Sequence, residues 1–283
     1  MTSAAIKLHQ IVYDAPSRAQ VFDPLIPLEN EHGPKDWFEF WPILDWLRTH
    51  SLNEDVWYGF VSPKFFDKCG LNWDDVRNLI DQNQHADVAL FTFDWFSIAY
   101  DKNVWTHGER MHPGLIAATH AFLKDSRIDI DLTKVTTDFE SAVFSNYVIA
   151  KPAYWYAWLS LAEKYWSYLE RAGSDVPDRK ATVHAGKQAY ELKVFVQERF
   201  PSIVLLQNEF TVVYPDYPSI VPSPRLQPKL DTTLVRALLR MTERYKRQQR
   251  KKGKTSGSLA STTAKFLVRA LISQKYRLSG REW

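Results

Sequence analysis

Short apolar runs alternate with amphipathic stretches over the first 200 residues of the chain. Runs rich in β-branched and aromatic residues predict strands at residues 6–13, 56–61, 87–93 and 139–150. Apolar positions that recur at a helical period predict helices at residues 41–48, 73–81 and 187–200, the last ended by Pro201. Strands separated by helices indicate an α/β fold with a single mixed sheet flanked by helices. Such sheets bind ligands at the carboxyl ends of their strands.

Residues 145–166, SNYVIAKPAYWYAWLSLAEKYW, join a polar pair, an apolar strand and an aromatic helix. Pro152 cannot donate to a sheet and ends the strand, and Trp155, Trp158 and Trp166 follow at helical spacing. Aromatic residues at this spacing more often form a core than a ligand platform. The short side chain of Asn146 at the strand edge can nevertheless read sugar hydroxyl groups, so the segment predicts a buried helix beside a sugar site.

The net charge of +3 hides a division between the two ends of the chain. Residues 225–283 contain 16 Lys and Arg against 3 Asp and Glu, a local charge of +13, so the remainder carries −10. Prolines punctuate the junction at Pro222, Pro224 and Pro228. We therefore divide the chain into an acidic α/β domain, residues 1–224, and a basic amphipathic helical tail, residues 225–283.

The tail contains two helical candidates around a break at GKTSGS. The first begins at Asp231 or Thr232 with apolar positions that include Leu238 and Leu239, and the second begins near Ser261. Basic amphipathic helices suit an anionic membrane surface, which predicts a peripheral protein on the inner face of the membrane. A solvated surface helix and nucleic-acid binding are the alternatives, and the acidic body argues against nucleic acid.

Motifs and cysteine content exclude several classes of protein. The single cysteine, Cys69, rules out a disulfide framework within the chain and a zinc site of several cysteines, so we expect a reducing, cytoplasmic location. No signal-peptide core and no run of about 18 apolar residues occurs. The chain also lacks GxGxxG, GxxxxGK[ST], GxSxG and HExxH, which argues against typical dinucleotide, P-loop, α/β-hydrolase and zinc-peptidase enzymes.

Four segments carry a resemblance to a known family. IKLHQIVY (6–13) resembles the first strand, and FSNYVIAKPAYWYAWL (144–159) a later strand-to-helix segment, of bacterial capsule and lipopolysaccharide glycosyltransferases with the GT-A-type fold. VWYGFVSPKF (56–65) and HADVALFTFDW (85–95) resemble segments of proteins from polysaccharide gene clusters. The resemblance spans roughly residues 6–200. It implies a GT-A-like sheet, a nucleotide-sugar donor with Gln10 and Tyr13 near the base, and a lipid-linked glycan acceptor.

The chain departs from that family at the metal site. GT-A-type enzymes usually present Asp-x-Asp, whose carboxylates hold Mg²⁺ or Mn²⁺ against the diphosphate. Here the matching position offers only Asp94, whereas Asp129 and Asp131 spell the motif in a region that reads as a loop. Either Asp94 binds the metal with a partner from elsewhere, or cations replace it. The candidates for that second role are Lys64, Lys151 and Arg199.

An inverting transfer also needs a general base to deprotonate the acceptor hydroxyl. Asp138 and Glu140, before the FSNY segment, and Glu198 are the candidate bases, and each is equally consistent with a surface carboxylate. The segment THGERMHPGL, with His107 and His112, reads as a loop, whose histidines are more often satisfied within the loop itself. The functional alternative is a loop that orders over substrate.

Three functions therefore compete on sequence grounds. The first is a membrane-attached glycosyltransferase of cell-surface polysaccharide synthesis. The second is a non-catalytic module that binds a glycan or a nucleotide. The third is a basic-tailed nucleic-acid binder, and the order of the resembling segments favours the first.

Overall fold

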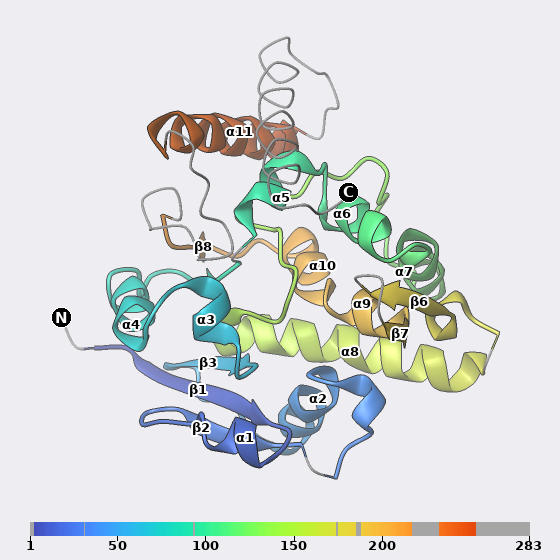
Figure 1. The fold of residues 1–283 in the computed structure, drawn as a ribbon, viewed down its shortest axis with the longest axis horizontal. Coiled ribbons are helices and arrows are strands. Elements are labelled where there is room, and N and C mark those ends of the chain that lie inside the picture. Colours follow the sequence, from blue (N-terminus) through green and yellow to red (C-terminus); the bar gives the residue numbers. More distant parts are fainter. Residues whose placement is uncertain are drawn as a thin grey trace.

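A mixed sheet organises the chain (Figure 1). The computed structural model describes residues 3–30, 32–92, 94–173, 175–184, 188–216 and 232–252. Within these residues the sheet has six strands, listed here in chain order: β1 (Ala5–Val12), β2 (Ile26–Glu29), β3 (Val56–Val61), β4 (Val88–Leu90), β5 (Val148–Ala150) and β8 (Val212–Val213). Their spatial order is β2-β1-β3-β5-β4-β8. The strand β1 is parallel to β2 and β3, β4 is parallel to β8, and β5 runs antiparallel to both β3 and β4.

Helices cover both faces of this sheet. In chain order they are α1 (Ala15–Arg18), the 3₁₀ helix η1 (Lys35–Trp37), α2 (Phe40–Thr49), α3 (Phe65–Cys69), α4 (Trp73–Asp81), α5 (Trp95–Tyr100), α6 (Val104–Met111), α7 (Leu115–Asp125), α8 (Pro152–Ala172), η2 (Pro177–Arg179), α9 (Lys193–Gln197), α10 (Phe200–Gln207) and α11 (Thr232–Lys252). A separate antiparallel hairpin, β6 (Ala181–His184) with β7 (Gln188–Glu191), precedes α9. The observed class is thus α/β with a mixed sheet flanked by helices, as the sequence predicts.

Alternation along the strands explains the two layers of helices. On β3, Tyr58 and Phe60 belong to the larger hydrophobic core with α2, α8 and α10, whereas Trp57 and Val61 belong to the smaller core with α3 and α4. Successive side chains of a strand point to opposite faces, so one apolar strand supplies both cores. On β5, Ile149 lies in the smaller core, whereas Val148 and Ala150 on either side of it in sequence lie in the larger core.

The aromatic helix α8 is a core element. Trp155 and Trp158 are 1% exposed, and the indole Nε1 of Trp155 donates to the carbonyl oxygen of Tyr58 on β3 at 2.9 Å. Pro152 occupies its first turn, where no backbone N–H is needed. The interpretation of these rings as core is confirmed, and the helix fixes the position of the sheet edge before it.

Three sequence-based expectations require correction. The strand expected at 139–150 forms only at Val148–Ala150, and the preceding residues are turns and bends. The helix expected at 187–200 is β7 followed by the short α9, and Pro201 lies in the first turn of α10 instead of ending a helix. Residues expected to form a loop around His107 form α6, because Asn103 and Thr106 make a reciprocal capping box.

The described part of the basic tail is α11, which packs on the body beside α5 (Figure 1). Leu238 and Leu239 lie in the larger core, and the Lys246 ammonium group donates to the carbonyl oxygens of Ile98 and Asp101. The helix starts at Thr232 and buries Leu238 and Leu239. The proline-rich junction, the boundary at residue 224 and the second candidate helix lie outside the described residues.

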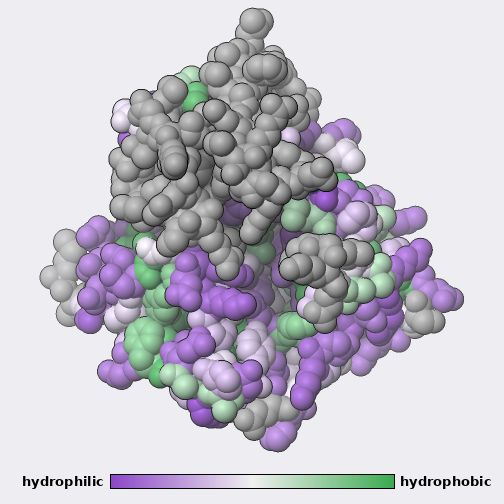
Figure 2. Space-filling model, in the orientation of Figure 1, coloured by the Kyte–Doolittle hydropathy of each residue, from purple (hydrophilic) through white to green (hydrophobic). Residues whose placement is uncertain are grey.

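Hydrophilic residues cover most of the described surface in Figure 2, and hydrophobic residues form small patches among them. Among the described helices, none combines the length and the apolar character that a membrane crossing needs.

Candidate functional site

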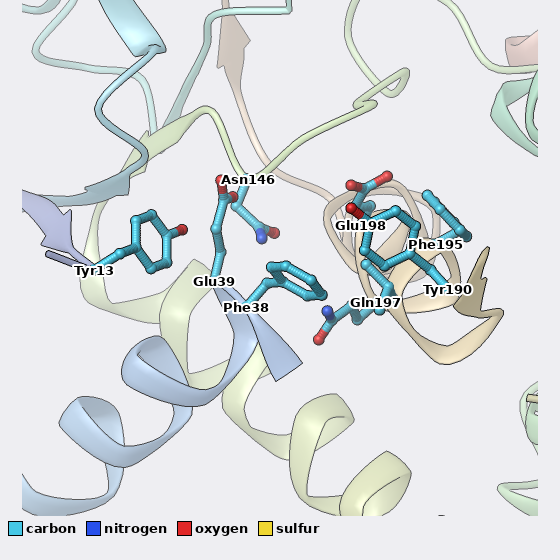
Figure 3. Close-up of a pocket in the computed structure, with 9 residues that line it drawn as sticks. Tyr13, Phe38, Glu39, Asn146, Tyr190, Phe195, Gln197 and Glu198 are labelled. Atoms are coloured by element: carbon cyan, nitrogen blue, oxygen red, sulfur yellow. The ribbon is translucent and has the colours of Figure 1, made fainter. Parts of the chain in front are cut away.

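A cavity of about 200 Å³ opens at the carboxyl ends of β1 and β3 (Figure 3). It is lined by residues from four separated segments: Tyr13, Phe38, Glu39, Asn146, Tyr190, Val194, Phe195, Gln197 and Glu198. The strand β1 pairs with β2 on one side and with β3 on the other, so the chain changes direction across the sheet at this point. Open α/β sheets bind ligands at such switch points.

The turn at Phe38 and Glu39 forms one wall. Phe38 has φ +46°, in the left-handed half of backbone space, although it is not a glycine. It ends η1, and Glu39 then begins α2. An L residue in this region costs about 1–2 kcal/mol, so the surrounding contacts must hold it there. Observed strain of this kind is concentrated at functional sites.

Two buried polar side chains of α9 contact the segment just before Phe38 and keep the turn in this conformation. The ammonium group of Lys193, which is 1% exposed, pairs with Asp36 in η1 and lies 4.9 Å from the ring centroid of Trp37. The amide nitrogen of Gln197 donates to the carbonyl oxygen of Trp37 at 3.2 Å. These contacts join segments far apart in the sequence, and they place the Phe38 turn opposite Glu198.

The carboxyl group of Glu39 is one of two acids with a raised pKa at the cavity. Burial raises its pKa from 4.5 to about 7, the charge of Glu198 adds to the rise, and Lys68 opposes it. Hydrogen bonds from the side chains of Asn146 and Ser62 also favour the ionised form. The residue as a whole is half-buried, and it lines the cavity. A carboxyl group that titrates near neutral pH suits proton transfer.

Glu198 is the second acid at the cavity and lies at the end of α9. Burial raises its pKa, while the nearby charge of Arg199 opposes this rise. The carboxylate accepts from Nη1 of Arg199 at 2.5 Å, and Arg199 itself is 3% exposed. Glu39 and Glu198 are therefore two carboxyl groups with raised pKa values at one cavity, in different settings.

Aromatic rings form the apolar part of the wall. Phe38 and Tyr190 meet edge to face with centroids 5.6 Å apart, and Phe195 stacks on His112 at 3.5 Å. In Figure 3, Tyr13 lies on the side opposite Tyr190 and Phe195, with Glu39 and Phe38 between them. Ring faces and a few polar groups are the usual lining of a small-molecule site.

Three residues predicted from the sequence meet at this cavity: Tyr13, Asn146 and Glu198. Arg199 lies behind Glu198 as its ion-pair partner. Gln10 is not among the lining residues, because its side chain is buried and its amide nitrogen donates to the carbonyl oxygen of Ser17 at 3.2 Å.

The remaining predicted residues lie elsewhere. Asp138 and Glu140 both pair with the Arg250 guanidinium group of α11, at 2.7 Å for Asp138. Lys151 precedes α8, and its ammonium group donates to the carbonyl oxygen of Gln84 at 2.9 Å. Lys64 precedes α3 and does not line the cavity.

Asp94, the predicted metal ligand, caps α5. Its carboxylate accepts from the backbone N–H of Ser97 at 3.1 Å and from the hydroxyl of Ser97 at 2.7 Å. Asp131, in the alternative Asp-x-Asp, accepts from Thr133 and pairs with Lys134. Among the described residues, no group of three or more His, Cys, Asp or Glu side chains is placed to hold a metal ion.

The residues of THGERMHPGL have structural partners. His107 on α6 lies 2.9 Å from the Asp101 carboxylate, and Glu109 accepts from the backbone N–H groups of Gly114 and Ile116 at the start of α7. These residues form a helix and the cap of its neighbour, not a loop over a substrate.

Sequence reasoning missed Phe38, Glu39, Tyr190, Phe195 and Gln197. One local signal existed for Glu39, a lone acid between aromatic residues in WFEFW. No local signal existed for Gln197, because its place at the cavity depends on the contact with Trp37.

Comparisons with protein-family models, with curated proteins and with solved structures find no match to this chain.

Proposed function

We propose that the protein is a glycosyltransferase that moves a sugar from a nucleotide-sugar donor to a lipid-linked glycan in cell-surface polysaccharide synthesis. The observation that carries this proposal is the pair of acids with raised pKa values, Glu39 and Glu198, at an aromatic-walled cavity at the carboxyl ends of the strands. The mixed sheet with its reversed strand β5 is compatible with the GT-A-type arrangement that the sequence resemblance implies.

The chemistry requires a base beside the sugar. In an inverting transfer the acceptor hydroxyl attacks the anomeric carbon, its proton passes to the base, and the bond to the diphosphate breaks. Glu39 is the base that we favour, because its pKa of about 7 lets it accept a proton near neutral pH. Glu198, with Arg199 beside it, is the alternative base.

The donor and the location extend this proposal. Tyr13 follows β1 and lies at the cavity, where the resemblance implies the nucleotide. Lys68 is a cation whose charge acts on both acids, so we assign it to the diphosphate, with or without Mg²⁺ or Mn²⁺. We further propose that the protein acts in the cytoplasm on the inner face of the membrane, with its basic tail toward anionic lipid.

Binding and turnover of donors test the proposal. Calorimetric titration of the full chain with a panel of nucleoside diphosphate sugars, with and without Mn²⁺, should identify a donor that binds. Slow hydrolysis of that donor, with water as the acceptor, then reports turnover without knowledge of the glycan. Absence of binding by every common nucleotide sugar under both conditions would overturn the proposal.

Variants of the two acids assign the base. Glu39→Gln preserves the shape of the side chain and removes its charge, so it should abolish turnover and retain donor binding. Glu163→Gln is the matched control, because Glu163 pairs with Arg48 at the surface and is not among the residues that line the cavity. If Glu198→Gln and not Glu39→Gln loses turnover, Glu198 is the base.

A non-catalytic glycan-binding module is the second candidate. The cavity volume favours it, because about 200 Å³ is smaller than the roughly 300–1,000 Å³ typical of drug-sized ligands. Sugar binding without turnover of any donor would select this function. Nucleic-acid binding has less support, because residues 1–224 carry a charge of −10, which repels phosphate.

A further inference from the structure

We propose that the cavity binds an amino sugar of the acceptor, whose ammonium group pairs with the carboxylate of Glu39. The inference rests on the proposed function in taking the ligand to be a carbohydrate acceptor. It names the chemical class of that acceptor from the groups that line the cavity and from the charges that lie behind them.

Two carboxyl groups line the cavity. Its charged lining residues are Glu39 and Glu198, and both are acids. Glu39 is half-buried, and the side chain of Glu198 is 32% exposed, so neither carboxyl-bearing side chain is closed off from solvent. A ligand in the cavity therefore meets carboxyl groups directly.

Two cations act on these acids from outside the cavity lining. Arg199 is 3% exposed, and its guanidinium group is engaged by Glu198 and by the carbonyl oxygen of Phe195. The ammonium group of Lys68 lies 5.6 Å from the ring centroid of Tyr147, which is 1% exposed. Neither Arg199 nor Lys68 is among the residues that line the cavity. Both cations therefore offset the charge of the acids without forming the surface that a ligand contacts.

The balance of these charges leaves Glu39 short of positive charge. At Glu198 the charges of Arg199 and Lys68 both lower the pKa against the effect of burial. At Glu39 the charge of Glu198 raises the pKa by more than the charge of Lys68 lowers it. Lys68 therefore does not neutralise the acid pair, and a positive charge that a ligand brings is favoured at Glu39.

The lining favours an organic cation over a metal ion. In the described part of the chain, no group of three or more His, Cys, Asp or Glu side chains is placed to hold a metal ion. The rings of Phe38, Tyr190 and Phe195 form the apolar part of the wall. In the view of Figure 3, the ring of Phe38 lies between the side chains of Glu39 and Glu198. Aromatic ring faces attract ammonium groups, so the rings and the carboxylates favour the same kind of ligand.

The size of the cavity allows a ring around the ammonium group. Its volume of about 200 Å³ far exceeds the roughly 10–15 Å³ that one water needs on a comparable measure. The aromatic rings also provide apolar surface for the C–H face of a pyranose. A sugar ring that carries an ammonium group uses both features of the lining.

An ammonium group at Glu39 also prepares the proposed base. The pKa of about 7 leaves about half of Glu39 protonated at neutral pH, and a protonated carboxyl group cannot accept a further proton. A paired ammonium group favours the ionised form, so binding of the acceptor releases that proton to water. A carboxylate has two oxygens, so one can hold the ammonium group while the other accepts the proton of the acceptor hydroxyl.

Ligand-observed NMR of the full chain at neutral pH tests the inference on the wild-type protein. The amine probes are methyl 6-amino-6-deoxyglucoside and methyl 2-amino-2-deoxyglucoside. Methyl glucoside and methyl N-acetylglucosaminide are their uncharged counterparts, and choline is an ammonium ligand that is not a sugar. We expect at least one amino glucoside to bind about tenfold or more tightly than both uncharged glycosides. Equal or weaker binding of both amino glucosides would overturn the inference, and so would binding of choline without binding of either amino glucoside.

Variants of two charged side chains should shift this binding in opposite directions. Glu39→Gln should weaken binding of the amino glucoside about tenfold. Lys68→Met should strengthen it about threefold, because it removes a cation that repels the ligand. Glu163→Gln and Lys124→Met are the matched controls and should leave binding unchanged, because neither residue lines the cavity and Lys124 is exposed at the end of α7.

Two results with these variants would contradict the charge argument. Unchanged binding in a folded Glu39→Gln protein would overturn the pairing with Glu39. Weaker binding of the amino glucoside by Lys68→Met would overturn the assignment of a cation to this cavity. The wild-type comparison still tests the amino-sugar site if a variant does not fold.

Binding of donors separates this inference from the proposed function. Lys68→Met should weaken binding of the nucleotide sugar, opposite to its effect on the amino glucoside, because the proposed function assigns Lys68 to the diphosphate. Preference for an amino glucoside with no binding of any nucleotide sugar would support the amino-sugar site and overturn the transferase. Turnover of a nucleotide sugar without that preference would support the transferase and overturn the amino-sugar acceptor.

Discussion

Replacing Glu39 with Gln should make the stability of the protein less sensitive to pH between about 4.5 and 7. Burial and the charge of Glu198 raise the pKa of Glu39 from 4.5 to about 7, which corresponds to about 3.4 kcal/mol. The residue is half-buried, and solvent screening reduces this figure to about 2 kcal/mol.

The sign follows from which state holds the proton more tightly. The pKa in the folded state lies above the unfolded value, so the contribution of Glu39 to stability is fully present below pH 4.5 and is lost as the pH rises through 7. Gln mimics the protonated carboxyl group at every pH. We therefore expect wild type and Glu39→Gln to be similarly stable at pH 4.5, and the variant to be more stable by about 2 kcal/mol at pH 8.

Urea unfolding of both proteins at half-unit pH intervals measures this difference. Glu163→Gln is the control of opposite sign, because hydrogen bonding to Arg48 lowers the pKa of Glu163 and its contribution is lost as the pH falls. A difference between wild type and Glu39→Gln that stays within about 0.5 kcal/mol across the range would refute the reasoning.

Three other predictions concern buried polar groups. His9 is 5% exposed, and burial lowers its pKa from 6.5 to about 4. Its contribution to stability is therefore present above pH 6.5 and is lost as the pH falls through 4. In urea unfolding, His9→Phe should remove up to about 3 kcal/mol of the stability that the wild type loses between pH 6.5 and 4. Tyr165→Phe should destabilise the protein by about 1–3 kcal/mol, because the Tyr165 hydroxyl donates at 2.6 Å to the buried Asp178 carboxylate, whereas Tyr156→Phe, at 46% exposure, should change thermal unfolding little. Arg250→Met should cost about 2 kcal/mol by leaving the Asp138 carboxylate, 1% exposed, without its cation, and equal stability of Arg250→Met and the exposed Arg244→Met would contradict this.

Local patterns predicted the elements whose residues are decided by their neighbours in sequence. The strand at Val56–Val61 and the helix at Trp73–Asp81 have the expected bounds, because an apolar run and the Asn72 cap with Asp75 act within a few residues. The expectation at 139–150 was wrong because most of these residues are buried in turns and bends. Buried turns contain apolar residues as strands do, so an apolar run alone does not identify a strand. Pro201 was read as a stop, although proline suits the first turn of a helix equally well.

The candidate site was predictable where it follows from strand ends. Tyr13 follows β1 and Asn146 precedes β5, and the parallel and antiparallel strands bring both residues to the same edge of the sheet. Asp138 and Glu140 were candidate bases on the same grounds as Glu198. Their partner Arg250 lies more than 100 residues away in sequence, so no pattern near them predicts that they form ion pairs. Long-range pairing therefore decides which acids line a cavity and which hold a helix.

The position of the acids at the cavity depends on polar contacts more than on the sheet itself. Glu39 follows η1, and η1 is joined to α9 by Lys193 and Gln197, while Glu198 ends α9. A buried ammonium group is costly unless it is paired, and an apolar residue at position 193 would fill the same space without that cost. The ion pair of Lys193 with Asp36 instead fixes how η1 lies against α9. The strained turn at Phe38 and the two raised pKa values then arise from one arrangement, in which α9 holds the Glu39 turn against the end of the sheet.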